Sequence, residues 1–230
     1  ISQEAGPAPA PLNPVFVEKL AWIIPGPENM FVPLELAAVA NYHGHLCPEL
    51  AVGYRAGLIA RASLNLHRQN AHEFFVVAEN LSSAIDALQY LTGCTFGNQS
   101  FYAFETGKHV YYFARYNKEQ VLHQTLRISL INPLIDLSPY QSIAARLCSG
   151  KTAPEEISLY HRAISQVVKD ILNLPEESLF TQKVVSIRRP QPFSRHAYSR
   201  CTCCGEVVAA FSIVVINDRP LCPVCAGREK

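Results

Sequence analysis

Two closely spaced pairs of cysteines near the C-terminus constrain the fold of this chain more than any other sequence feature. Cys201 and Cys204 form one C-x-x-C pair, and Cys222 and Cys225 form a second. The stretch between them, 207–216, is apolar and rich in β-forming residues. Two such pairs supply the four thiolates of a tetrahedral zinc site. We therefore predict a small, closed, structural Zn²⁺ module, in which the metal stabilises a segment too short to build its own core.

The sequence leaves the role of this zinc module open. Cys203 is a spare thiol that could replace a ligand, such as Cys201, or point away. Basic and aromatic residues precede the module, a mixture that suits phosphate contact and base stacking; the arginines are Arg188, Arg189, Arg195 and Arg200. A nucleic-acid-binding regulator is therefore one hypothesis, and it predicts binding that weakens steeply with salt. Because the formal net charge is only +1, we favour a rigid knuckle that docks on the rest of the chain or on a partner.

A second group of potential metal ligands consists of His43, His45 and Cys47. Helical patterns flank the group on both sides; Gly44 interrupts the first, and Pro48 suits the first turn of the second. Cys47 would then be the N-cap residue, where the helix N-terminus favours a thiolate. Two imidazoles and a thiolate suit a transition metal such as Zn, Fe or Ni, or a reactive cysteine. A buried cysteine with two histidines that cap a turn is the structural alternative.

The length and composition of the chain limit the number of domains and the class of protein that we expect. The 230 residues allow one large domain and a small one, and 49% of them are hydrophobic whereas 17% are charged. So few charges suggest that a second copy of the chain covers part of the surface, as in a homodimer. No apolar run approaches the ~20 residues of a membrane-spanning helix. Clustered cysteines favour metal over disulfides and a cytoplasmic location, although a chain that starts at Ile1 leaves open a removed signal peptide.

Hydrophobic periodicity predicts both helices and strands along the chain. We expect an extended, proline-rich lead-in over 1–14, a core domain over 15–189, and a linker with the zinc module over 190–230. Small residues in the helix after Cys47, including Gly53 and Gly57, would let another helix or a subunit approach closely. The expected helices are 16–24, 33–42, 49–70, 82–91, 139–147 and 152–174, the last capped by Thr152; the expected strands are 74–78, 101–105, 109–115, 122–130 and 184–187.

Several short motifs between Leu34 and Leu130 resemble the FmdE family of formylmethanofuran dehydrogenase proteins. The motifs are His43-Gly44-His45-Leu46-Cys47-Pro48, Gly53-Tyr54-Arg55-Ala56-Gly57, Asp86-Ala87-Leu88-Gln89, Gly93-Cys94-Thr95-Phe96-Gly97 and Gly107-Lys108. The resemblance implies an α+β core, usually dimeric, with mixed helices packed on an antiparallel-rich sheet. The C-terminal cysteine module is similar to one that some members carry.

The resemblance also implies a core metal site built from His43, His45, Cys47 and Cys94, with Asp86 and Gln89 lining the same pocket. The family is linked to molybdenum and tungsten formylmethanofuran dehydrogenases, and many members resemble accessory or metal-handling proteins without an established reaction. We therefore expect a metal-binding accessory protein, with an oxidoreductase complex as a possible partner.

The chain departs from the family pattern at three positions. The family often has Pro-Gly where this chain has Pro48-Glu49, a cysteine where it has Ser83, and a lysine where it has Asn98. Losing a thiolate at Ser83 would weaken or retune a core metal site, and Glu49 could supply an oxygen ligand instead.

The chemistry of the core pocket stays open at this stage. Arg55 could reach a small anionic ligand there, or it could be salt-bridged elsewhere. A three-ligand metal with an open position could activate water or polarise a carbonyl, with Glu49 or Asp86 as general base. A thiol-redox protein that uses Cys47 and Cys94 is the remaining alternative.

Overall fold

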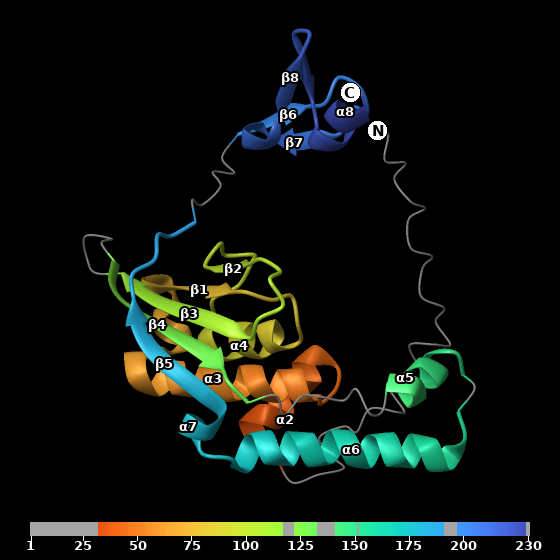
Figure 1. Ribbon diagram of the computed structural model, residues 1–230. Helices are drawn as coiled ribbons and strands as arrows, with labels where there is room; N and C mark the ends of the chain where they lie inside the picture. The colour runs from red at the N-terminus through yellow and green to blue at the C-terminus, as the bar shows by residue number, and fades with distance from the viewer. Residues whose placement is uncertain (1–31, 117–121, 133–140, 151, 191–196, 229–230) are drawn as a thin grey trace. The chain divides into compact units, whose positions relative to one another are not determined.

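A computed structural model describes residues 32–116, 122–132, 141–150, 152–190 and 197–228 (Figure 1). Contacts divide the chain into two units, Ile1–Arg188 and Arg189–Lys230, which we call the core unit and the C-terminal unit. The lead-in over 1–14 and the expected helix over 16–24 lie outside the described residues.

One five-stranded sheet forms the centre of the described core unit, with strand order β2-β1-β3-β4-β5. β1 pairs in parallel with β2, and all other neighbours are antiparallel. The sheet is therefore mixed and antiparallel-rich, which confirms the predicted α+β class. Its strands are β1 (Phe74–Ala78), β2 (Phe101–Ala103), β3 (Val110–Tyr116), β4 (Leu122–Leu130) and β5 (Phe180–Val185).

Most helices of the core unit share one apolar core with one face of this sheet, whereas α5 packs on α6 through a separate cluster around Ile143 (Figure 1). Successive side chains of a strand point to opposite faces of the sheet. Val76 and Phe113 therefore belong to the main core with the helices, whereas Phe75 belongs to a smaller cluster on the other face. None of the described helices is long and apolar enough to cross a membrane. The helices are α2 (Leu34–His43), α3 (Pro48–Leu64), η2 (Arg68–Glu73), α4 (Ala84–Thr92), α5 (Gln141–Cys148), α6 (Pro154–Asn173) and α7 (Glu176–Leu179).

α3 lies within the core, and two of its glycines, Gly53 and Gly57, let α4 pack closely against it. A Cβ at Gly53 would lie 2.3 Å from the backbone oxygen of Ala84, and one at Gly57 would lie 2.6 Å from Leu91 Cδ1. Both contacts are with α4. The close approach expected for this stretch is therefore made by a helix of the same chain, which brings the start of α4 beside the start of α3.

Several element boundaries differ from the sequence prediction, and three of these differences have a clear physical reason. α3 ends at Leu64 instead of continuing to 70, because Asn65 adopts a left-handed conformation with φ 51°. α6 is capped at Ala153, not at Thr152, and the Glu156 carboxylate accepts the Ala153 N–H at 3.3 Å. Pro154 explains the shift, because a proline is best placed at the first helical position. The last strand is β5 rather than 184–187, since it pairs with β4 from Phe180 onward.

The C-terminal unit contains two small antiparallel sheets, β6-β7 and β8-β9. The apolar stretch 207–216 is not one strand, because a 3-10 turn interrupts it. The buried cluster consists of Cys201, Leu221, Cys222, Cys225 and Ala226, so cysteines make up most of the interior. The elements are β6 (Tyr198–Arg200), β7 (Val207–Ala209), η4 (Ala210–Ser212), β8 (Val214–Ile216), β9 (Arg219–Leu221) and α8 (Pro223–Arg228).

Candidate metal centres

The junction between α2 and α3 has the local geometry that its sequence predicts. α2 ends at His43, and Gly44 adopts φ 102° while its N–H bonds to the Ala40 carbonyl at 2.8 Å. That conformation favours glycine and turns the chain sharply. Cys47 is the N-cap of α3 and Pro48 follows at the first helical position. The turn therefore presents three side chains from five consecutive residues to one place.

His43, His45 and Cys47 are brought together as potential ligands. One ligand atom from each lies within 4.8 Å of the other two. The two imidazole rings are 4.5 Å apart between centroids and are tilted by 49°. Two nitrogens and one sulfur from a single turn leave further coordination positions for a bound group.

Asp86, in the first turn of α4, orients one of these ligands. Its Oδ2 lies 2.7 Å from His43 Nδ1, so the proton on Nδ1 is held by the carboxylate and Nε2 is the nitrogen left for a metal. A carboxylate behind a ligating histidine is the common arrangement in metal sites, because it fixes the tautomer and makes the ring more basic. Sequence spacing alone does not place Asp86 beside His43; α4 does so by packing on α3.

The electrostatics of this group favour a thiolate. Burial alone would raise the pKa of Cys47, but hydrogen bonds with His43 and His45 lower it to about 6. In turn the Cys47 thiol, followed by Asp86, raises the pKa of His43 to about 9 against the opposing effect of burial. Ser83, which stands where the family often has a cysteine, also bonds to Cys47 and lowers the pKa of its thiol.

His43 shows how well these residues fit a metal. Its Nε2 atom is buried and, apart from the interaction of the ring with the Cys47 thiol, has no hydrogen-bond partner within the described residues. A buried nitrogen with so few partners suits a bound metal. The atom stands beside a thiol and a second imidazole, which together form a donor set that Zn, Fe or Ni accepts.

Two residues expected in this pocket, Cys94 and Gln89, make hydrogen bonds to other parts of the core unit. Cys94 is buried, and its Sγ is 3.8 Å from the carbonyl oxygens of Ala71 and Phe74. It is not among the ligand atoms that gather at Cys47, because the turn after α4 directs it toward η2 and the start of β1. Gln89 uses its Oε1 to accept the Phe96 N–H at 3.1 Å, so it stabilises the turn after α4.

Arg55 also differs from the expectation that it reaches an anionic ligand. Its guanidinium donates to the carbonyls of Ile171, Leu172 and Leu174 at 2.8, 2.6 and 3.0 Å. These are carbonyls at the C-terminal end of α6, which an intrahelical bond cannot satisfy. Arg55 therefore caps α6, and its charge complements the helix dipole there.

Glu49 does lie near the junction, and it faces two residues that the sequence analysis missed. Its Oε1 is 3.9 Å from His109 Nε2, and His109 Nδ1 is 2.9 Å from the hydroxyl of Tyr111. Burial lowers the pKa of His109 despite the nearby Glu49, so the imidazole is neutral near pH 7. The spacing of His109 and Tyr111 at alternate positions is the only signal in the sequence that they share one side of the sheet.

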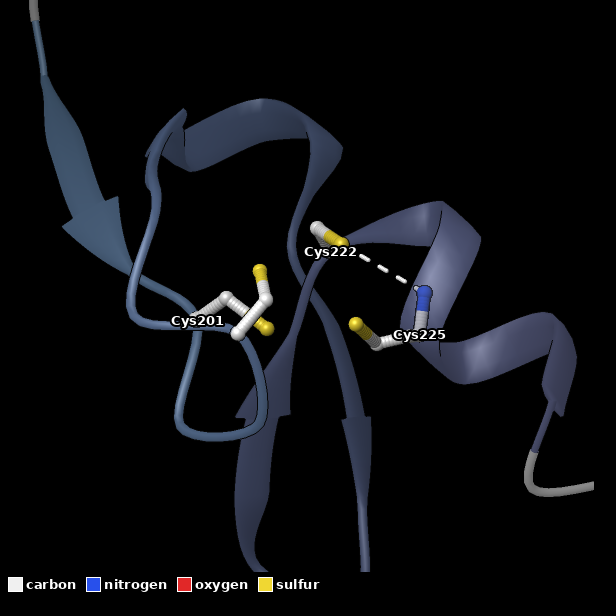
Figure 2. Close-up of side chains that lie close together, drawn as sticks. Cys201, Cys222 and Cys225 are labelled. Atoms are coloured by element: carbon white, nitrogen blue, oxygen red, sulfur yellow. Dashed lines mark hydrogen bonds between the residues drawn. The ribbon is translucent and has the colours of Figure 1, made fainter.

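The four predicted ligands of the C-terminal unit also converge. One sulfur from each of Cys201, Cys204, Cys222 and Cys225 lies within 4.8 Å of the others. Figure 2 shows the side chains of Cys201, Cys222 and Cys225 directed toward one another. Backbone N–H groups of Cys204 and Cys222 lower the pKa of Cys201 to about 6. Four thiols in this arrangement fit a tetrahedral ion, and Zn²⁺ is the commonest ion at such sites.

Comparison with known families identifies the core unit. Residues 42–181 match the family model described as FmdE, molybdenum formylmethanofuran dehydrogenase operon. The chain belongs to the FmdE family. The match begins in the last residues of α2, just before the His/Cys junction, and ends in β5, so it includes α3 and α4 but only the end of α2.

Two individual proteins extend the comparison. A probable S-adenosyl-L-methionine-binding protein of Archaeoglobus fulgidus is 23% identical over 216 residues, which are 91% of this chain and 57% of that protein. The chain thus spans little more than half the length of that relative. The crystal structure of a tungsten formylmethanofuran dehydrogenase FmdE-like protein from Syntrophus aciditrophicus aligns with a TM-score of 0.50 at 18% identity, over 83% of this chain and 89% of that one. This FmdE-like structure shares the fold.

Proposed function

We propose that this FmdE-family protein is a metal-binding accessory protein whose core unit holds a transition metal at His43, His45 and Cys47. The observation that carries the proposal is the convergence of these three ligand atoms within 4.8 Å. Asp86 supports it, since its carboxylate holds His43 Nδ1 and leaves Nε2 as the nitrogen that can bind a metal. A metal held by three protein ligands would keep one open coordination position, and it would act as a Lewis acid on a group bound there.

The wider role follows from the family. We propose that the protein serves molybdenum or tungsten formylmethanofuran dehydrogenase-type metabolism as a cytoplasmic homodimer, with an oxidoreductase complex as its partner. The family description supports the link to this metabolism, whereas the homodimer and the cytoplasmic location rest on the low fraction of charged residues and on the clustered cysteines. In the C-terminal unit we propose a zinc ion at Cys201, Cys204, Cys222 and Cys225, whose sulfurs already converge.

Elemental analysis of the full-length protein, purified without added metal, tests both sites. We expect metal at each cluster, loss of the core metal alone in Cys47→Ser, and loss of the C-terminal zinc alone in Cys222→Ser. Cys94→Ser is the matched control: it removes a buried thiol that lies against Ala71 and Phe74, so both metals should stay. Equal metal content in Cys47→Ser and the unchanged protein would refute the core site.

A reactive thiolate at Cys47 is the second candidate function, and a specific observation favours it. Cys47 is the N-cap of α3, and its hydrogen bonds with His43, His45 and Ser83 lower its pKa to about 6. A thiolate at neutral pH is the nucleophile that thiol chemistry requires. The expected disulfide with Cys94 does not fit, because Cys94 bonds to the carbonyls at Ala71 and Phe74. This candidate is therefore a single nucleophilic cysteine.

The pH dependence of alkylation tests the second candidate in protein stripped of metal by a chelator. A depressed pKa means that the thiolate is present above the pKa and is lost below it. The iodoacetamide rate at Cys47, read by peptide mass spectrometry, should be half-maximal near pH 6 and level above it. Cys94, whose pKa is raised by burial, serves as the internal control and should stay unreactive. A half-maximal rate near pH 8 or above at Cys47 would eliminate the candidate.

A further inference from the structure

We propose that His109 is the proton acceptor of the core site, for a ligand that binds at the open position of the metal through an acidic O–H group. The expected ligands are weak oxygen acids, which lose their proton more readily as they bind a metal. Glu49 and Tyr111 position the imidazole from its two sides. The inference rests on the proposed function, because it requires the metal at the junction between α2 and α3.

His109 lies beside the turn that carries the metal ligands, on the side formed by α3. Cys47 is the N-cap of α3, and Glu49 is in the first turn of that helix. The Glu49 Oε1 atom is 3.9 Å from His109 Nε2. Glu49 thus reaches His109 from a position two residues beyond the thiol, so the imidazole is a neighbour of the ligand turn.

The start of α4 connects the same two groups from another side. Ser83 bonds to Cys47, and its neighbour Ser82 interacts with the hydroxyl of Tyr111. That hydroxyl is 2.9 Å from the Nδ1 atom of His109. Contacts through α3 and contacts through α4 therefore both lead from the thiol to the imidazole, so the ligand turn and His109 belong to one polar cluster.

The imidazole is held in one orientation and is able to take up a proton. The side chain of His109 is only 14% exposed, and burial lowers its pKa, so the ring is neutral near pH 7. Its Nδ1 is held by the hydroxyl of Tyr111, a side chain that is fully buried in the main core. When Nδ1–H donates to the Tyr111 oxygen, Nε2 keeps its lone pair and is the atom that accepts a proton from a ligand.

Nearby carboxylates stabilise the imidazolium that the transfer creates. Burial has the largest effect on the pKa of His109, but Glu49 from α3 and Glu105 from the loop before β3 both raise it. A distance of 3.9 Å between Glu49 and Nε2 is too long for a hydrogen bond. The Glu49 side chain is 44% exposed, however, so it is able to move toward Nε2–H once the ring is charged.

The step transfers a proton and needs no oxidant or reductant. The O–H bond of the ligand breaks and its electron pair stays on the oxygen, while an N–H bond forms at His109 Nε2. The ligand becomes an anion, which a metal ion binds more firmly than the neutral acid, and the imidazole becomes an imidazolium. Release of the ligand reverses both changes, because His109 returns the proton to the oxygen.

The release of protons when acetohydroxamic acid binds to the zinc-loaded, full-length protein tests this role. Isothermal titration calorimetry in two buffers with different heats of protonation measures how many protons reach the solvent. Near pH 7 we expect little release from the unchanged protein, because His109 keeps the proton, and nearly complete release from His109→Gln. His72→Gln is the matched control: this exposed histidine precedes β1, at the end of the strand opposite to Tyr111, and its variant should release no more protons than the unchanged protein.

Glu49→Gln provides a second variant, whose partly exposed side chain makes it safe for folding. Without the carboxylate charge the imidazolium is less stable, so proton release should lie between that of the unchanged protein and that of His109→Gln. Release from either variant that equals that of the unchanged protein overturns the proposal, and so does a zinc-loaded protein that binds no hydroxamate. Hydroxamate binding that is undiminished in Cys47→Ser would instead overturn the proposed core metal, and this inference with it.

Discussion

At the scale of single residues, the core site depends on which nitrogen of His43 faces the thiol. The hydrogen bond from Nδ1 to Asp86 decides this, because it fixes the proton on the far side of the ring. An asparagine at position 86 can offer either an amide oxygen or an amide NH₂ to Nδ1, so it no longer specifies one tautomer. Asp86 is therefore a positioning residue that acts through His43.

Asp86→Asn should lower the metal affinity of the core site by about 10- to 100-fold, the usual effect of losing a carboxylate behind a ligating histidine. A competition titration against a chelating dye measures this, in a Cys222→Ser background so that only the core site is read. Gln89→Asn is the control, since Gln89 lies one turn along α4 and contacts the Phe96 N–H. An affinity that matches the background protein would show that Asp86 does not orient the ligand.

Individual residues of the two sites show which parts of each site could be predicted from the sequence. His43, His45 and Cys47 lie so close in sequence that any chain turn keeps them together, and the four C-terminal cysteines follow a spacing whose chemistry is well known. Cys94 and Arg55 could not be placed in this way. Their surroundings, the carbonyls near Ala71 and those at the end of α6, belong to segments distant in sequence, and only the packed fold brings them together.

At the scale of elements, the contact between α3 and α4 builds the core site. Asp86 and Ser83 both come from the start of α4, and they reach the junction only because α4 lies tightly on α3. Sequence periodicity predicted both helices but not the end of α3. The helix ends because Asn65 adopts a left-handed conformation. Asparagine tolerates this conformation but does not require it, so the sequence does not specify the end of the helix.

Gly53→Ala should destabilise the core unit, because the added Cβ would meet the Ala84 backbone oxygen at 2.3 Å and backbone cannot move aside cheaply. Overpacking of this kind costs typically ~1–3 kcal/mol. Gly57→Ala is the matched control in the same helix: its Cβ would meet the flexible side chain of Leu91, so the loss should be smaller. Urea unfolding followed by circular dichroism measures both. Equal midpoints for Gly53→Ala and the unchanged protein would contradict this account of the contact.

At the scale of the whole molecule, the two units are stabilised by different means. The core unit has a continuous apolar interior built from its helices and one face of its sheet. The C-terminal unit has an interior made mainly of cysteines, joined by Leu221 and Ala226. Apolar burial scales with size, so we expect a unit this small to depend on bonds between its thiolates and a metal, and the core unit to fold without them.

Removing metal should therefore unfold the C-terminal unit and leave the core unit folded. Amide hydrogen exchange on the full-length protein, with and without a strong chelator, reports on each unit separately. With chelator we expect the amides of β6–β9 and α8 to lose protection and those of β1, β3 and β4 to keep it, because the sheet of the core unit is covered by apolar packing. The Cys222→Ser protein should show the same pattern without chelator. Protection of β8 and β9 that survives both treatments would mean that the cysteines themselves suffice as a core, and that the metal serves chemistry rather than folding.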